Sequence, residues 1–194
     1  MQIKIPADIQ DRIKQLLGDP NTLTLFRVLA VPLVVILLLM PNRFTCFLAA
    51  MLFSLAAITD YFDGFLARQK GMVSNLGKVM DPVADKLLVA STFIMIASLG
   101  WVPAWVVCII VGRELAVTGL RNLMVEHKED VSASRLGKYK TGFQIAAAIP
   151  LLLHYTYLTI DMQAIGMFFL WCALIFTLWS GIDYFVRYRA LLKA

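Results

Sequence analysis

Residues 60–85 read DYFDGFLARQKGMVSNLGKVMDPVAD and place four carboxylates, Asp60, Asp63, Asp81 and Asp85, at the edges of strongly apolar segments. A carboxylate at the centre of a membrane helix costs about 2.5 to 3.5 kcal/mol, so its presence there calls for a function. The spacings i, i+3 and i, i+4 put each pair on one face of a helix. Two such faces turned toward each other would gather oxygen ligands of the kind that Mg2+ or Mn2+ prefers. The alternative is a set of solvated acids at helix ends.

The composition predicts an integral membrane protein. The chain has 194 residues, of which 60% are hydrophobic and 16% are charged, and its mean hydropathy is +0.75. This length allows one bundle of about six spans of roughly 20 residues with short connections. The expected fold class is therefore all-α, a polytopic membrane protein with six transmembrane helices. We expect these helices at 23–41, 44–67, 78–98, 102–125, 138–157 and 163–186.

The first residues are predicted to lie apart from the bundle. Ile5, Ile9 and Ile13 share one face of a short segment whose charged residues lie elsewhere, which is typical of an amphipathic helix in the membrane interface. We therefore expect a cytoplasmic interfacial helix at 1–19 and a six-helix membrane domain at 20–194. A short apolar core followed by small residues at a cleavage site is lacking, so a removed signal peptide is not expected.

Basic residues predict the orientation in the membrane. Lysine and arginine are concentrated near 68–78, near 126–140 and in the C-terminal tail, whereas the alternate loops hold only Arg43. Both termini and the aspartate site should then face the cytosol, and the membrane is expected to be a bacterial inner membrane. The net charge of +5 favours contact with anionic lipids or substrates on that side. Nucleic-acid binding is not expected, because no soluble basic domain is predicted.

A second polar group, which is basic, follows in the fourth and fifth predicted spans. Arg113 lies well inside an apolar segment, where an unpaired cation is costly. We expect that Glu114 does not share its face, because neighbours at i and i+1 point apart on a helix, whereas Arg121 does. The next helix carries further donors, so the two helices together could bind a phosphate and favour a phosphorylated acceptor. The expected phosphate-binding residues are Arg113, Arg121, Lys138, Lys140 and Thr141.

The aspartates, together with Gly64, Ala67, Arg68 and Gly77 between them, resemble the signature of the CDP-alcohol phosphatidyltransferases. These membrane enzymes move a phosphatidyl group or an alcohol phosphate from a cytidine diphosphate donor. The resemblance runs from about residue 20 to about residue 185. Further motifs resemble the branch that uses glycerol 3-phosphate. They are Pro20-Asn21-x2-Thr24-x2-Arg27, Gly112-Arg113-Glu114, Thr118-Gly119-Leu120-Arg121 and Leu136-Gly137-Lys138-Tyr139-Lys140-Thr141.

This resemblance implies a homodimer of six-helix subunits that transfers the phosphatidyl group of CDP-diacylglycerol to sn-glycerol 3-phosphate, giving phosphatidylglycerophosphate and CMP. A pair of Mg2+ or Mn2+ ions would hold the donor diphosphate through Asp60, Asp63 and Asp81, and Asp85 would complete the site. Asp81 and Asp85 would be catalytic, with Asp85 as the candidate general base. Its ordinary pKa of about 3.9 makes it a weak base, so a role as ligand alone stays open. The implied donor-binding residues are Asn21, Thr24, Arg27, Gly64, Ala67, Arg68 and Gly77.

Three of these residues have a structural alternative. Asn21 is also a natural helix N-cap. Ala67 is small enough to serve helix packing in a membrane without touching a substrate. Lys140 would also fit as a boundary cation on the cytoplasmic side of its span.

Two alternative functions stay open. Another member of the same family would use inositol phosphate, serine or phosphatidylglycerol as acceptor. From a different class, a divalent-cation transporter would also place carboxylates inside the membrane. The placement of the acids toward one side, without an inverted repeat, weighs against the transporter.

Overall fold

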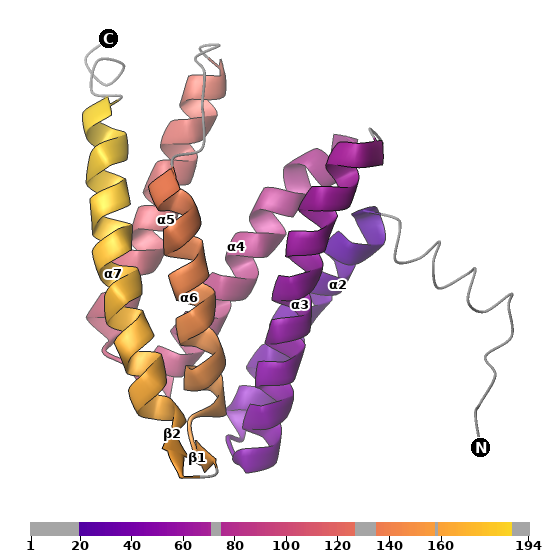
Figure 1. Ribbon diagram of the computed structural model, residues 1–194. Coiled ribbons are helices and arrows are strands. Elements are labelled where there is room, and N and C mark those ends of the chain that lie inside the picture. Colours follow the sequence, from indigo (N-terminus) through magenta and orange to yellow (C-terminus); the bar gives the residue numbers. More distant parts are fainter. Residues whose placement is uncertain (1–19, 71–74, 127–134, 158, 188–194) are drawn as a thin grey trace, which may run out of the picture.

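The computed structural model describes residues 20–70, 75–126, 135–157 and 159–187, so the predicted interfacial helix at 1–19 lies outside the described residues. The described part is mostly helical, which confirms the all-α class, and each predicted span overlaps one helix (Figure 1). The helices are α2 (Pro20–Leu39), α3 (Arg43–Lys70), α4 (Asn75–Ser98), α5 (Ala104–Glu126), α6 (Arg135–Leu153) and α7 (Met162–Arg187).

Successive helices run in opposite directions (Figure 1). The C-terminal ends of α3, α5 and α7 therefore lie at the same end of the bundle as the N-terminal ends of α2, α4 and α6. Side chains at the opposite end cap two of the helices. Asn42 Oδ1 accepts hydrogen bonds from the backbone N–H groups of Phe44 at 2.9 Å and Thr45 at 3.0 Å at the start of α3. Asp161 Oδ1 accepts one from Ala164 N at 3.2 Å at the start of α7. Such caps satisfy backbone donors that a helix leaves open.

The connection between α6 and α7 differs from the prediction. The predicted span at 138–157 is wrong at its end, because α6 stops at Leu153 and His154 takes a left-handed backbone conformation with φ of 55°. Such a φ is uncommon for residues other than glycine and cannot continue a right-handed helix. The chain then forms an antiparallel hairpin of β1 (Thr156–Tyr157) and β2 (Ile160–Asp161). The hairpin makes the reversal between the two helices.

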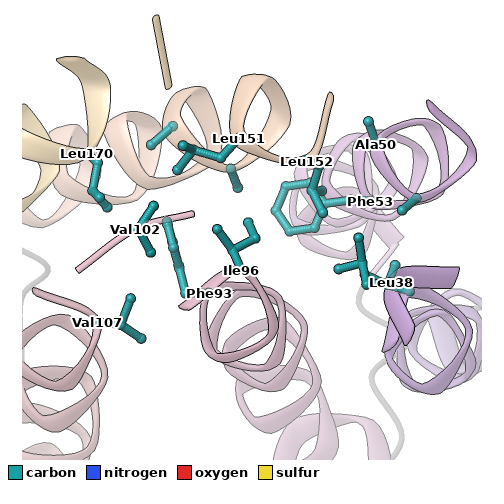
Figure 2. Close-up of a cluster of buried hydrophobic side chains, with 14 of the residues drawn as sticks. Leu38, Ala50, Phe53, Phe93, Ile96, Val102, Val107, Leu151, Leu152 and Leu170 are labelled. Atoms are coloured by element: carbon teal, nitrogen blue, oxygen red, sulfur yellow. The ribbon is translucent and has the colours of Figure 1, made fainter. Parts of the chain in front are cut away.

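The helices pack in two neighbouring groups, one of α2, α3 and α4 and the other of α5, α6 and α7. α2 packs against both α3 and α4, α6 packs most extensively against α7 and also against α3, and α5 contacts α4 and α7. Phe53 of α3, Ile96 of α4 and Leu152 of α6 belong to one buried cluster in which the groups meet (Figure 2). The apolar core therefore holds together the helices that bear the acidic and the basic motifs.

Length and composition make one described helix a candidate membrane span. Among the described residues, α7 is long and apolar enough over Met162–Val186 to cross a bilayer. The other apolar helical stretches are shorter, at Leu25–Leu39, Arg43–Thr59 and Lys86–Ser98. Six transmembrane spans therefore stay a prediction.

We predict that Gly166→Ala loosens the contact between α6 and α7. A Cβ atom added at Gly166 would lie 2.6 Å from Cγ and 2.9 Å from the backbone nitrogen of Leu151, and backbone cannot move aside as a flexible side chain can. Overpacking of this kind costs about 1 to 3 kcal/mol. Thermal unfolding in detergent should show a lower melting temperature for Gly166→Ala. The control is Gly142→Ala, where an added Cβ meets nothing within 4 Å, and an equal loss in both variants would contradict this packing.

Candidate active site

The acidic motif lies on α3 and α4, and α2 packs against both of these helices. Asp60 and Asp63 fall in the C-terminal half of α3, and Asp81 and Asp85 in the N-terminal half of α4, toward the same end of the bundle (Figure 1). Their side chains are outside those that the structure describes, so the predicted convergence of the four carboxylates stays a prediction. The same holds for the side chains of other predicted site residues, namely Asn21, Thr24, Ala67, Arg68 and Lys138. Gly64 and Gly77 lie in α3 and α4.

Arg27 is the predicted donor-binding residue whose side chain is described. It lies on α2 and is only 2% exposed, which places it among the largest fully buried side chains of the described part. A buried guanidinium is stable only beside anionic or polar groups. Because α2 packs against both α3 and α4, Arg27 is carried by the helix that borders both aspartate-bearing helices.

The basic motif forms a charged group between α5 and α6. Glu114 Oε1 accepts a hydrogen bond from Lys140 Nζ and lies 3.5 Å from Arg113 Nη1. The expectation that Glu114 stays apart from Arg113 was wrong. Although the Cβ atoms of neighbouring residues point apart, both side chains are long enough to bend toward each other. Lys140 is 5% exposed, so it is a buried ion-pair partner and not a boundary cation.

Arg113 also connects this group to α7. Its Nη2 donates a hydrogen bond to Ser180 Oγ at 2.9 Å, and Ser180 Oγ in turn donates to the carbonyl of Thr177 at 3.3 Å. Gly181 makes room for the arginine, because a Cβ atom there would lie 3.2 Å from Arg113 Cγ. Arg113 Nε is buried and has no hydrogen-bond partner within the described residues. Residues of α5 and α7 thus hold the guanidinium through its two terminal nitrogens.

Lys86 is a residue of this region that the sequence analysis missed. It follows Asp85 on α4, and its Nζ donates a hydrogen bond to Thr118 Oγ1 on α5. Thr118 Oγ1 donates in turn to the backbone carbonyl of Glu114 at 2.6 Å. The sequence held a signal for Lys86, since it is a cation in an apolar helix directly after the aspartate signature. α4 therefore carries both acidic residues and a lysine that faces the basic group.

A cavity of about 30 Å3 lies between α4, α5 and α6. Its polar wall consists of Lys86, Glu114, Thr141 and Gln144, and its remaining lining is apolar. Gln144 is 3% exposed, and its Nε2 has no hydrogen-bond partner in the part of the chain that the structure describes. A buried amide donor normally has a partner, and the cavity is large enough for an ordered water or the end of a polar ligand.

The structure brings some predicted acceptor-binding residues together and leaves one outside. Arg113 and Lys140 meet at Glu114, and Thr141 lines the adjoining cavity while its hydroxyl donates to Gly137 O at 3.3 Å. Arg121 is exposed on α5, although its charge still acts on Arg113. No cluster of three or more histidine, cysteine, aspartate or glutamate residues suited to a metal occurs among the described side chains, a set that does not include the four aspartates.

The sequence pattern of the family described as CDP-alcohol phosphatidyltransferase matches residues 18–179. The chain belongs to the CDP-alcohol phosphatidyltransferase family. It is similar to "CDP-diacylglycerol--glycerol-3-phosphate 3-phosphatidyltransferase" of Bacillus subtilis strain 168, with 39% identity over 186 residues, 90% of this chain and 96% of the relative. A relative of the same name in Rickettsia prowazekii has 39% identity over 86% of this chain and 92% of the relative. Another in Escherichia coli K12 has 36% identity over 88% of this chain and 94% of the relative. The predicted family is thereby confirmed.

We predict that Ser180→Ala destabilises the protein, because it leaves one N–H of the half-buried Arg113 without its partner. The loss of a hydrogen bond to a charged group costs about 1 to 3 kcal/mol. Thermal unfolding should show a lower melting temperature for this variant. The matched control is Ser54→Ala, because among the described residues the hydroxyl of Ser54 bonds only to the carbonyl of Ala50 in its own helix, at 2.7 Å. Equal melting temperatures for the two variants would contradict the role of Ser180.

Proposed function

We propose that this protein transfers the phosphatidyl group of CDP-diacylglycerol to sn-glycerol 3-phosphate, producing phosphatidylglycerophosphate and CMP. The proposal rests on the family, on the printed name of the relatives and on one structural observation. That observation is the buried group of Arg113, Glu114 and Lys140, which adjoins the helix that carries Asp81 and Asp85. An acidic signature for a metal-bound diphosphate and a basic group for an acceptor phosphate are the two parts that this reaction requires.

The acceptor phosphate would bind between α5 and α6. Arg113 offers a planar guanidinium with an unused Nε donor, and Lys140 offers a point charge. Gln144 Nε2 and the Thr141 hydroxyl lie at the adjoining cavity. Phosphate oxygens accept several charge-assisted hydrogen bonds at once. A phosphorylated alcohol therefore satisfies this group of donors better than glycerol, serine or another acceptor without a phosphate.

The acidic residues would hold the donor. Asp60, Asp63 and Asp81 would form an all-oxygen ligand set that suits a pair of Mg2+ or Mn2+ ions, with Asp85 as a further ligand. Such ions neutralise charge on a diphosphate and orient it for displacement. Asn21, Thr24, Arg27 and Arg68 would contact the donor phosphates, while the small residues Gly64, Ala67 and Gly77 would leave room for cytidine.

The transfer would be a direct displacement at the phosphorus of the phosphatidyl group. The acceptor hydroxyl oxygen forms the new P–O bond, the P–O bond to CMP breaks, and CMP leaves with the bonding electron pair. Asp85 would accept the hydroxyl proton, and it lies one helical turn from Asp81 and directly before Lys86. Lys86 reaches toward α5, so α4 would border both substrates.

The membrane arrangement that we propose has six spanning helices, with both termini and the active site in the cytosol of a bacterium, an interfacial helix at 1–19 and a homodimeric assembly. Leu29, Leu33 and Ile36 of α2, and Ile175 of α7, are each at least half exposed. Apolar surface of this extent is expected where side chains face lipid.

The proposed function is tested by CMP release from CDP-diacylglycerol in detergent micelles. We expect release that requires both Mg2+ and glycerol 3-phosphate and that Asp81→Asn abolishes, since the amide lacks the charge that holds the cation. The control is Asp161→Asn, an exposed site in β2 at the other end of the bundle, which should retain full activity. CMP release by Asp81→Asn at the rate of the unmodified protein would contradict the proposed site.

A further inference from the structure

We propose that Glu114 is a positioning residue, which holds Lys140 and Arg113 where they bind the acceptor phosphate. This inference rests on the proposed function and deepens it, because it explains a carboxylate inside a site for an anion. A negative charge there would by itself repel a phosphate. Its presence therefore needs a reason, and the contacts of Glu114 supply one.

The first observation is that one carboxylate oxygen serves two cations from two helices. Glu114 Oε1 accepts a hydrogen bond from Lys140 Nζ of α6 and lies 3.5 Å from Arg113 Nη1 of α5. The exposed fractions of the two cationic side chains are only 6% and 13%. Both cations lie at the same carboxylate oxygen, so they are close enough for their charges to repel each other. A carboxylate between them offsets that repulsion while the three residues together keep a positive charge.

The second observation is that Glu114 is itself held in place. Its backbone carbonyl accepts a hydrogen bond from Thr118 Oγ1 at 2.6 Å, and Thr118 Oγ1 accepts one from Lys86 of α4. Arg113 is fixed on its other side by Ser180 of α7. Glu114 thus lies at the centre of a network that joins α4, α5, α6 and α7, with its carboxylate bound to Lys140 and Arg113 and its backbone carbonyl bound to Thr118. Such a network restricts the rotamers of the long cationic side chains before the substrate arrives, which lowers the entropic cost of binding.

The third observation is the position of Glu114 at the cavity. Glu114 shares the polar wall with Lys86, Thr141 and Gln144. Gln144 Nε2 is a buried donor without a hydrogen-bond partner among the described residues. The carboxylate and an unused donor therefore border the same small space. Glu114 thus holds two repelling cations as a fixed pair and itself borders that space.

A different role for Glu114 would change acceptor binding in the opposite direction. If its carboxylate merely filled the phosphate position until substrate displaced it, then removal of its charge would strengthen acceptor binding. If it positions the cations, removal weakens acceptor binding, because Lys140 and Arg113 then move apart. The Michaelis constant for glycerol 3-phosphate separates the two roles directly.

The test compares Glu114→Gln, Glu114→Asp and the unmodified protein in the CMP-release assay, with each substrate varied in turn. We expect Glu114→Gln to raise the KM for glycerol 3-phosphate on the order of tenfold or more, as the loss of a supporting partner commonly does. The KM for CDP-diacylglycerol should change less than about twofold, since the donor site is on other residues. Glu114→Asp keeps the charge and should recover part of the loss. Asp161→Asn, the distant carboxylate, should leave both constants unchanged.

An unchanged or lower KM for glycerol 3-phosphate in Glu114→Gln overturns the proposal, as does an equal rise in both KM values. A double variant gives a further check, because Glu114→Gln should add little once Lys140→Met has removed the cation that it positions. If Glu114→Gln does not fold, Glu114→Asp tests the proposal in its place. An unchanged KM for glycerol 3-phosphate in that variant would again contradict it. A failure of the proposed function would instead appear as unmodified protein that releases no CMP with glycerol 3-phosphate.

Discussion

A cation buried in an apolar bundle needs an opposite charge, and Glu114 provides it for Lys140 and Arg113. The carboxylate connects α5 to α6, while the hydrogen bond of Arg113 to Ser180 extends the connection to α7. Apolar contacts alone allow the helices to pack in several registers. Ion pairs and hydrogen bonds are directional, so they limit the packing to a few of these registers. The position of the basic group relative to the aspartate helices depends on this interaction.

The acidic and the basic residues lie on different helices that are close neighbours. The acids lie on α3 and α4, and the bases lie mainly on α5 and α6. α4 contributes to both, because Asp81 and Asp85 precede Lys86, which contacts Thr118 on α5. A donor held by the acids and an acceptor held by the bases would then meet along one helix. This proximity is what a direct displacement requires.

Much of the fold follows from the sequence, because long apolar segments separated by polar loops can bury their backbone groups only as helices. The end of α6 does not follow, since the left-handed turn at His154 and the hairpin after it leave no apolar pattern. In the site, residue types and spacing predicted one group of Arg113, Arg121, Lys138, Lys140 and Thr141. Of these, Arg113, Lys140 and Thr141 lie together, Arg121 is exposed, and the side chain of Lys138 is outside those described. The pairing of Arg113 with Glu114 was not predicted, because helical periodicity places Cβ atoms but does not fix where long side chains end. Lys86 was missed for the same reason, since its partner lies on another helix.

We propose that the buried basic group beside the aspartate helices selects a phosphorylated acceptor. The most direct measurement offers the purified protein CDP-diacylglycerol and Mg2+ with equal concentrations of glycerol 3-phosphate, glycerol, serine and inositol phosphate, and identifies the lipid products by mass spectrometry. We expect phosphatidylglycerophosphate as the dominant product, with essentially no phosphatidylglycerol formed directly from glycerol. Comparable products from glycerol or serine, or no lipid product from any acceptor, would contradict it.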